Sequence, residues 1–354
     1  MRRYFLASLA AFLALVYPGS GKAQTTTNPN ISFIGDMRII GNRGMPQDGS
    51  NGKLRLDFHE LELAAGGYLN PYARADITLS VSGGGIDIEE AYATLLKGLP
   101  WNLQIKAGQY LVDFGKINSQ HAHKWSWMER PLMFRQFFGE EGLKTPGLNA
   151  STLIPVGASA LTISANLLKR PPLVGEDQSA GAPNLAGSAR ISFFATFSNH
   201  SSFEAGVSGF AAGRNPAEKK PPVMGDIDLK YKWRPDAYRS LTFVLESLVS
   251  SREYANLGAS GTGKTTASGT FMAIDYQFRR RYNAGFLLDY SQTPTDNKVR
   301  QTGFGFFAGF SVAEETYRIQ FLVRHDQGTA LVKSFETIEV QLLWSLGPHK
   351  PHQF

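Results

Sequence analysis

The feature that most constrains the fold is an alternation of apolar and polar side chains that recurs along the chain. In residues 226–234 every second residue is apolar and the residues between them are all charged. Successive side chains of a β-strand point to opposite faces, so such a segment forms a strand with one apolar and one polar face. The pattern recurs at residues 73–82, 270–279, 282–291, 300–312, 317–325 and 334–346. The chain is therefore predicted to be all-β.

Breaks between the alternating segments divide the chain into about sixteen strands of roughly 9–13 residues, near the length of a tilted strand that crosses a membrane. After Tyr17 no apolar run approaches the roughly 18 residues that a membrane helix needs. The predicted strands begin near Asn30, Leu54, Pro71, Ile86, Trp101, Gly147, Ser159, Ala186, Ser202, Met224, Arg239, Ser268, Tyr282, Arg300, Glu315 and Ser334.

The predicted connections alternate between short and long, as do the periplasmic turns and outer loops of an outer-membrane barrel. The one exception is the outer connection at residues 83–85, which is short. The long connections are residues 41–53, 113–146, 169–185, 214–223, 252–267, 293–299 and 326–333. The predicted fold is therefore a transmembrane antiparallel β-barrel of about sixteen strands, and a soluble all-β protein is the alternative. About eight strands would fill such a barrel with side chains, whereas sixteen leave an aqueous channel.

The N-terminal segment has the organisation of a secretory signal peptide. Arg2 and Arg3 precede an apolar run that ends at Tyr17, and Gly21 and Ala23 then provide small residues at the two positions that a signal peptidase inspects. We expect cleavage after Ala23, with residues 24–354 forming a single barrel domain that ends in a periplasmic tail at 347–354. A retained N-terminal helix is the alternative. The chain has no cysteine, which excludes disulfides and thiolate metal sites.

The longest connection, residues 113–146, is rich in aromatic and charged residues and is the third outer loop in this count. By analogy with general porins, we expect it to fold into the lumen, where charges beside a narrow passage control selectivity. A loop that only caps the barrel is the alternative. The residues predicted to line the constriction are Lys116, Lys124, Glu129, Arg130 and Arg135.

The polar faces of the strands predict a lumen with a slight excess of basic residues, and hence a weak preference for anions. This assignment depends on the strand register, which a single bulge would change. The basic residues that we place on the lumen side are Arg74, Lys106, Lys230, Lys232, Arg318 and Arg324.

His121 and His123 are two positions apart in the long connection and form a candidate metal site. Imidazole together with a carboxylate, for example from Glu129 or Glu140, suits zinc and similar ions. The alternative is that the two histidines brace the loop by hydrogen bonds. No other cofactor is expected.

The string that begins at Gly258 and ends at Thr265 matches the nucleotide phosphate-loop pattern. A working phosphate loop needs a strand before it and a helix after it, whose N-terminal amides hold the phosphate. The residues that follow, 270–279, instead alternate as a strand. We therefore interpret the match as fortuitous and predict no nucleotide site.

Several segments also resemble a porin-like family of bacterial outer-membrane barrels. They include His59-Glu-Leu-Glu-Leu, Glu89-Glu-Ala-Tyr, Phe114-Gly-Lys-Ile-Asn-Ser-Gln-His-Ala-His and Glu129-Arg-Pro-Leu. Members are often labelled zinc-regulated outer-membrane receptors or uncharacterised porin-like proteins. The resemblance implies a location in the outer membrane of Gram-negative bacteria more firmly than it implies a substrate.

Together these features predict an outer-membrane porin through which small polar or weakly anionic solutes diffuse. The alternative is a metal-linked uptake or receptor barrel that uses the loop of His121 and His123. The sequence shows no nucleophile and base that together suggest catalysis, so we predict neither an enzyme nor a nucleic-acid partner. Lipids and solutes are the expected partners, and a homotrimer is expected by analogy with porins.

Overall fold

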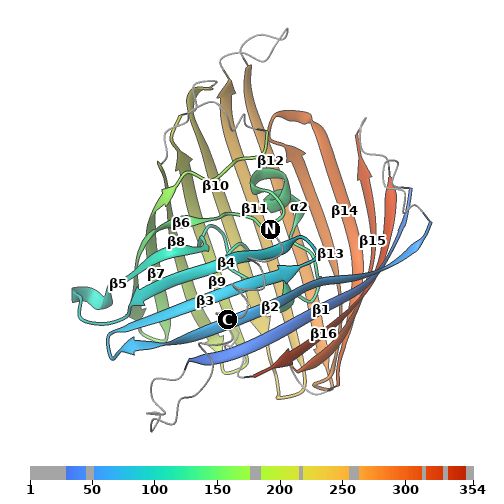
Figure 1. The fold of residues 1–354 in the computed structure, drawn as a ribbon, viewed down its shortest axis with the longest axis horizontal. Coiled ribbons are helices and arrows are strands. Elements are labelled where there is room, and N and C mark those ends of the chain that lie inside the picture. Colours follow the sequence, from blue (N-terminus) through green and yellow to red (C-terminus); the bar gives the residue numbers. More distant parts are fainter. Residues whose placement is uncertain are drawn as a thin grey trace, which may run out of the picture.

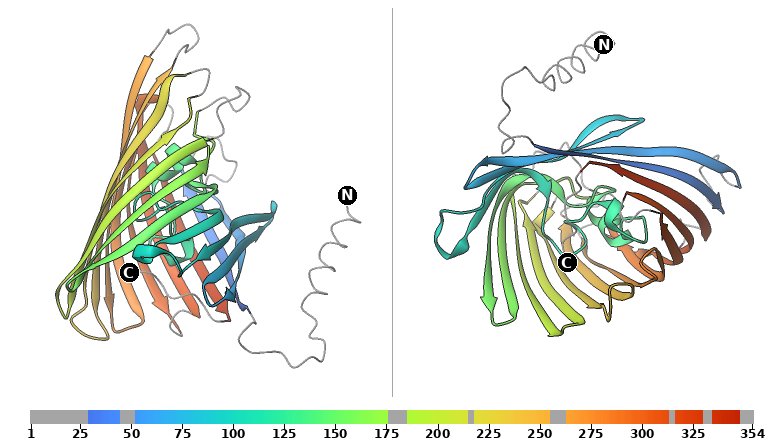
Figure 2. Two further views of the ribbon diagram at one scale, coloured as in Figure 1. Left: turned by 90° about the vertical axis from the view of Figure 1, so that its left-hand side faces the viewer. Right: turned by 90° about the horizontal axis from the view of Figure 1, so that it is seen from below.

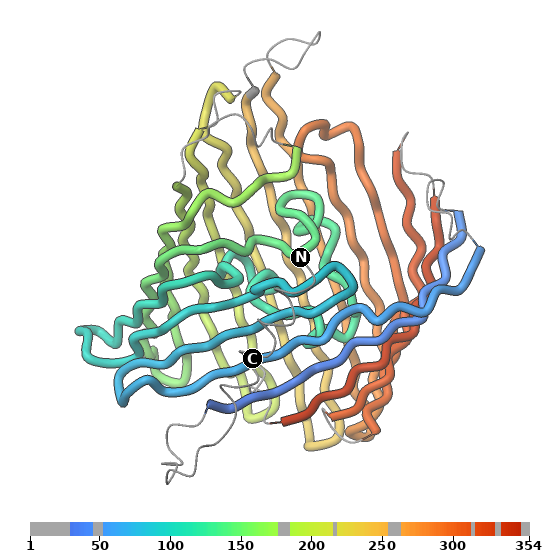
Figure 3. Tube along the Cα trace, in the orientation of Figure 1, coloured from blue at the N-terminus to red at the C-terminus, as the bar shows by residue number. Residues whose placement is uncertain are grey.

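The computed structural model describes residues 29–44, 52–175, 185–214, 218–254, 263–312, 316–329 and 334–347. Sixteen antiparallel strands form a closed barrel in which β1 pairs with β16, as the adjacent blue and red tubes show (Figures 1 and 3). The strands are β1 (Asn30–Arg43), β2 (Leu54–Asn70), β3 (Ala73–Ser82), β4 (Gly85–Leu95), β5 (Gln104–Leu111), β6 (Lys144–Val156), β7 (Ser159–Lys169), β8 (Leu185–Ser198), β9 (Ser201–Ala212), β10 (Glu218–Trp233), β11 (Ser240–Tyr254), β12 (Gly263–Phe278), β13 (Tyr282–Thr293), β14 (Asp296–Ser311), β15 (Tyr317–Gly328) and β16 (Phe335–Leu346).

The described helices are short. They are η1 (Pro100–Asn102), η2 (Ala122–Lys124) and α2 (Leu132–Phe138). No helix in the described ranges is long and apolar enough to cross a lipid bilayer. The predicted signal peptide at 1–23 and the tail from residue 348 onward lie outside the described residues.

The prediction of a sixteen-stranded antiparallel barrel is confirmed. Several strands are longer than predicted: β2 has 17 residues, and β10, β12 and β14 have 16 each. The additional residues of these strands still pair with the neighbouring strand through backbone hydrogen bonds. Segments that were expected to be loops because they are polar therefore belong to strands. The third outer connection is therefore 112–143 and not 113–146, because Lys144, Thr145 and Pro146 pair with β5.

The alternation of the sequence separates a lumen face from a lipid face. In β10, Asp226 is 2 % exposed and Asp228 5 %, whereas Ile227 between them is 60 % exposed. Rings also stack in series around the short turn between β12 and β13, where Phe278 and Tyr282 have centroids 5.8 Å apart. Such an aromatic band is typical of the membrane–water interface.

Two β-bulges interrupt the alternation on neighbouring strand pairs. Asp36 pairs with Glu60 and Met37 with Phe58, so His59 is an extra residue in β2. Thr78 pairs with Glu90 and Leu79 with Ile88, which leaves Glu89 as an extra residue in β4. An extra residue re-aims the side chains beside it, and here it turns two consecutive polar side chains toward the lumen.

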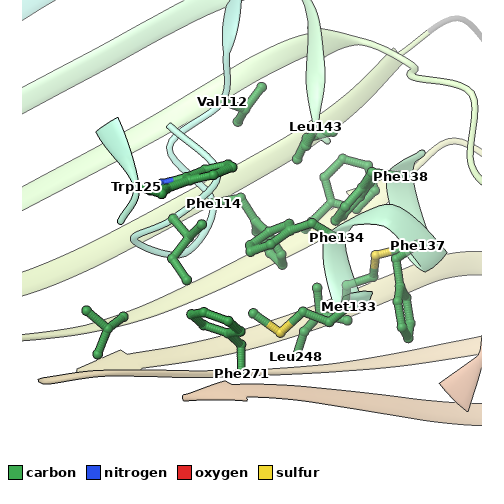
Figure 4. Packing of buried hydrophobic residues seen from close by; sticks show 14 of the residues in the cluster. Val112, Phe114, Trp125, Met133, Phe134, Phe137, Phe138, Leu143, Leu248 and Phe271 are labelled. Carbon is green, nitrogen blue, oxygen red and sulfur yellow. The ribbon is translucent and has the colours of Figure 1, made fainter. Parts of the chain in front are cut away.

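The connection 112–143 lies inside the barrel (Figure 2, right). Its apolar side chains form a buried core with apolar residues of the barrel wall, and Figure 4 shows part of this packing. Trp125 and Trp127 stack with centroids 6.0 Å apart, and Trp127 packs on Phe271 of β12 at 5.0 Å. Apart from Tyr110 of β5, the wall residues in this core come from β7 to β15, so the connection fills that side of the lumen.

Candidate functional site

Backbone hydrogen bonds to acidic side chains hold the start of the connection against the wall. The N–H groups of Lys116 and Ile117 donate to Oε2 of Glu246 on β11, at 3.1 and 2.9 Å. Gly115 has a φ of +69°, and a Cβ there would lie 1.9 Å from Oε1 of Glu246. Only glycine therefore allows the chain to approach this carboxylate so closely.

The rest of the connection is anchored to β12, β13 and β15. Ser126 Oγ donates to Asp275 at 2.6 Å, and the N–H of Leu132, the first residue of α2, donates to Asp289 at 2.9 Å. Arg324 of β15 lies 3.4 Å from Glu129 and also pairs with Asp289. These contacts fix the connection as an ordered wall of the lumen.

Two cavities remain beside β1 to β7. The inner cavity has a volume of about 480 Å³, and its lining includes Lys106 of β5 and Lys232 of β10, near the short turns. The outer cavity has a volume of about 410 Å³, and its lining includes Glu140 and Lys144 near the long loops. The residues that line both cavities are Glu62, Leu111 and His121.

A cluster of two histidines and three glutamates lies where the cavities meet; we call His121, His123, Glu62, Glu89 and Glu90 the histidine–carboxylate cluster. His121 Nδ1 lies 2.9 Å from Glu89 and 3.6 Å from Glu62, and its Nε2 lies 3.1 Å from Glu90. His123 Nδ1 lies 3.0 Å from Glu62, and the two imidazole rings stack at 5.7 Å. The connection thus meets β2 and β4 through these five side chains.

The two histidines titrate differently because they face different numbers of carboxylates. Burial lowers the pKa of His121, but hydrogen bonds to Glu89 and Glu90 and the charge of Glu62 outweigh it and raise the pKa to about 10. For His123, burial is the largest influence, and it lowers the pKa despite the single neighbouring carboxylate of Glu62. The carboxylates around His121 thus favour its protonated form, whereas burial favours neutral His123.

The predicted constriction residues are divided among three cavities. Lys124 lines the inner cavity, whereas Lys116 lies beside a smaller cavity of about 150 Å³ and pairs with Glu204 at 2.5 Å. Those that line the outer cavity are Glu129, Arg130 and Arg135. They do not form one ring, because the connection runs along the lumen instead of crossing it at a single height.

Burial and neighbouring charges shift the pKa values of the charged loop side chains in the outer cavity. Burial raises the pKa of Glu129, but the charges of Arg135, Arg324 and Arg38 outweigh it and hold this pKa below its ordinary value. Burial lowers the pKa of Arg130 to about 10 despite nearby glutamates, and its guanidinium lies 5.2 Å from the Trp125 ring. The ion pair of Glu129 with Arg324 of β15 thus connects the loop to the barrel wall.

The predicted basic residues of the lumen also have different surroundings. Lys230 and Lys232 line the inner cavity, as does Lys106, whose Nζ lies 4.6 Å from the ring centroid of Tyr92. The remaining three form ion pairs or hydrogen bonds: Arg74 to Asp76 at 2.9 Å, Arg318 to the carbonyl of His123, and Arg324 to Asp326 at 2.8 Å. Three of the six predicted basic residues therefore line the inner cavity.

Sequence analysis did not identify the acidic part of the site. Glu60, Glu62 and Glu89 line the outer cavity, and Glu90 lines the inner one. A signal was present, since His59-Glu60 and Glu89-Glu90 are consecutive polar pairs inside otherwise alternating segments. Such pairs indicate a bulge in a strand that has one polar face.

Side chains that could hold a metal ion come together in two groups of the described residues, and one group contains His121, one of the two predicted histidines. Ligand atoms of Glu62, Glu89 and His121 all lie within 4.8 Å of one another, and a second such group is Asp36, His59 and Glu60. His123 stacks on His121 but belongs to neither group. Neither Glu129 nor Glu140 takes part either.

The end of the phosphate-loop match lies on a strand. β12 begins at Gly263, and Lys264 and Thr265 pair with Glu253 and Arg252 of β11. A helix N-terminus would be needed at this place to hold a phosphate. The earlier residues of the match, 258–262, lie outside the described ranges.

Comparison with known proteins finds relatives of the fold. No protein family model matches the chain. An uncharacterised protein of Aquifex aeolicus (strain VF5) is 29 % identical over 259 residues, which are 65 % of this chain and 53 % of that protein. The chain therefore matches about half of this relative's length.

Solved structures of low sequence identity superpose over most of the chain. An anion-selective porin from Comamonas acidovorans has a TM-score of 0.61 at 10 % identity and covers 90 % of this chain and 100 % of its own. The outer membrane channel DcaP of Acinetobacter baumannii has a TM-score of 0.61 at 11 % identity, with 93 % and 100 % covered. The chain has the fold of an outer-membrane porin. OprB of Pseudomonas putida, at 9 % identity and a TM-score of 0.59 with 91 % and 94 % covered, has the same porin fold.

Proposed function

We propose that this porin-type barrel is a channel for passive diffusion of small polar or weakly anionic solutes across a bacterial outer membrane. The observation that carries the proposal is the pair of cavities on the β1–β7 side, which share Glu62, Leu111 and His121 within a closed sixteen-stranded barrel. The structural neighbours are described as porins and channels, which does not favour the metal-linked uptake or receptor alternative.

The charges along the cavities support a weak preference for anions at the inner end. The basic residues of the inner cavity are Lys106, Lys124, Lys230 and Lys232, and its acidic residues are Glu62, Glu90 and Asp113. The outer cavity has the opposite balance, because it contains six glutamates. A solute thus meets an acidic chamber and then a basic one. Fields of opposite sign in series keep net selectivity weak.

Location and assembly are part of the proposal. A signal peptide that is cleaved after Ala23 directs export of the chain, which then inserts into the outer membrane of a Gram-negative bacterium. A homotrimer is supported by the fold alone: the trimer form of OmpT of Vibrio cholerae has a TM-score of 0.57 at 8 % identity, with 90 % of this chain covered and 100 % of that chain.

Planar-bilayer recording tests the proposal. The refolded protein is expected to give discrete single-channel openings, with a reversal potential under a salt gradient that reports a weak anion preference. Chemical cross-linking of the same preparation reports whether it is trimeric. Absence of openings from protein that has the circular dichroism of a folded barrel would overturn the channel function.

A further inference from the structure

We propose that the histidine–carboxylate cluster binds one transition-metal dication through His121 Nδ1, Glu62 and Glu89, at the passage between the two cavities. The binding part stands on the geometry of these side chains alone. Its consequence for transport rests on the proposed channel function.

The spacing of the donor atoms suits a small dication. Zinc binds histidine nitrogen and carboxylate oxygen at roughly 2.0–2.2 Å, which places neighbouring ligand atoms of a tetrahedral site roughly 3.3–3.6 Å apart. His121 Nδ1 lies 2.9 Å from one Glu89 oxygen and 3.6 Å from one Glu62 oxygen. Small rotations of these side chains are therefore enough to form three bonds to one ion.

The second nitrogen of His121 is already oriented as a metal-binding histidine requires. Its Nε2 lies 3.1 Å from Glu90 Oε2. Metal-ligating histidines commonly donate their other N–H to a carboxylate, which fixes the ring and strengthens the ligand. Glu90 has this position, while Glu62 and Glu89 face Nδ1 on the opposite edge of the ring. Binding of an ion through Nδ1 displaces any proton from that nitrogen, because a ligating imidazole nitrogen must be deprotonated.

The β4 bulge makes this arrangement possible. Consecutive residues of a regular strand point to opposite faces, so Glu89 and Glu90 could not both reach one imidazole. The shift in pairing between Thr78 and Leu79 removes this restriction, and the two carboxylates contact the two nitrogens of the same ring. Bulges are enriched beside functional sites because they re-aim side chains in this way.

The donor set selects the class of ion. Calcium and magnesium take oxygen ligands, whereas a mixed set of imidazole and carboxylate suits zinc and similar transition metals. The other described group, Asp36, His59 and Glu60, is less suitable. Its Asp36 is engaged by Arg38 at 2.6 Å, and Gln341 donates to it at 2.8 Å.

An ion at this position would join the connection to β2 and β4. His121 belongs to the connection, whereas Glu62 and Glu89 belong to the wall. Because Glu62 and His121 line both cavities, an ion held between them narrows the passage. Conductance is then expected to fall when the metal is bound.

Calorimetric titration of Zn²⁺ into chelator-treated, refolded protein in detergent tests the binding. We expect one equivalent per chain, with affinity reduced at least tenfold in Glu89→Gln and in His121→Asn. Glu90→Gln is also expected to weaken binding, by roughly 10–100-fold, because it removes the carboxylate that orients the His121 ring and leaves the three ligands in place. His200→Asn, in an exposed turn between β8 and β9, is the matched control and should bind as the wild type does.

No binding to the wild type would overturn the proposal, as would unchanged affinity in folded Glu89→Gln. A planar-bilayer recording tests the channel function independently of the calorimetric test of metal binding. Openings that zinc does not affect, without calorimetric binding, remove the metal site and leave the channel. Stoichiometric binding to a protein that never conducts removes the channel and leaves the metal site.

Discussion

The backbone N–H of Ile117 donates a 2.9 Å hydrogen bond to Oε2 of Glu246, although 129 positions separate the two residues. The same oxygen accepts from the N–H of Lys116, and the Glu246 side chain is fully buried. A buried carboxylate thus satisfies backbone donors at the start of a loop that has little regular secondary structure. Where the loop lies in the lumen depends on such wall side chains.

Replacement Glu246→Ala is therefore expected to release the start of the loop. The buried N–H of Ile117 and the partly buried N–H of Lys116 lose their acceptor, which costs about 1–3 kcal/mol for a buried group left unsatisfied. Single-channel recordings should show larger and noisier openings. Glu253→Ala is the control, because Glu253 pairs with the largely exposed Lys220 at the end of β11. Openings like those of the wild type in Glu246→Ala would show that this contact does not hold the loop.

Arg324 is expected to be necessary for stability. It contacts Glu129, Asp289 and Asp326, and it is 3 % exposed. Replacement Arg324→Met leaves buried carboxylates without their cation, a change that costs about 3–5 kcal/mol. Urea unfolding in lipid vesicles measures the loss. Arg239→Met, on an exposed short turn, serves as the control and should unfold as the wild type does. Equal midpoints for both variants would contradict this account.

Acid is expected to loosen the outer part of the loop through Glu129. The folded-state pKa of Glu129 lies below its ordinary value of 4.5, so its contribution to stability is complete above that value. The contribution is lost as pH falls through the lowered pKa, since protonation removes the pairing with Arg135 and Arg324. Current noise should therefore rise below pH 4.5. Glu129→Gln should be noisy at neutral pH and show less further change on acidification.

The lysines of the inner cavity are expected to set the ion preference. Lys230→Gln together with Lys232→Gln removes two of the four basic side chains that line this cavity. The reversal potential in a salt gradient should shift toward that of a more cation-selective channel, because the field at the inner end becomes less positive. Lys298→Gln, exposed at the start of β14, should leave the potential unchanged. The same shift in both variants would point to surface charge as the source of selectivity.

The strands could be predicted from the sequence because their signal is local. Alternation in seven segments, together with the breaks between segments, predicted about sixteen strands, and the lumen position of Asp226 and Asp228 followed from the alternation. The ends of the strands were less accurate, since pairing continues into polar residues such as those at the start of β14. At His59 and Glu89 the alternation itself fails, because a bulge in one strand depends on the register of its partner.

The candidate site was predicted only in part. The histidines in the long loop were identified as chemically notable, but their partners Glu62, Glu89 and Glu90 were not. His121 is separated from Glu90 by 31 positions and from Glu62 by more, so no spacing pattern connects them. The residues predicted to line the constriction lie in the loop, and their division among three cavities depends on the path of the folded loop.

The sequence by itself determined the architecture. A period of two in polarity, which recurs along the chain, fixes antiparallel strands with one wet and one apolar face. Closure of the barrel follows because an open edge would leave backbone groups unpaired in a bilayer. Only the tertiary structure decided the site. Its contacts join a loop to two bulged strands, and they form because the loop buries its aromatic side chains against β7 to β15 and leaves His121 facing β2 and β4. Such long-range packing has no periodic trace in the chain.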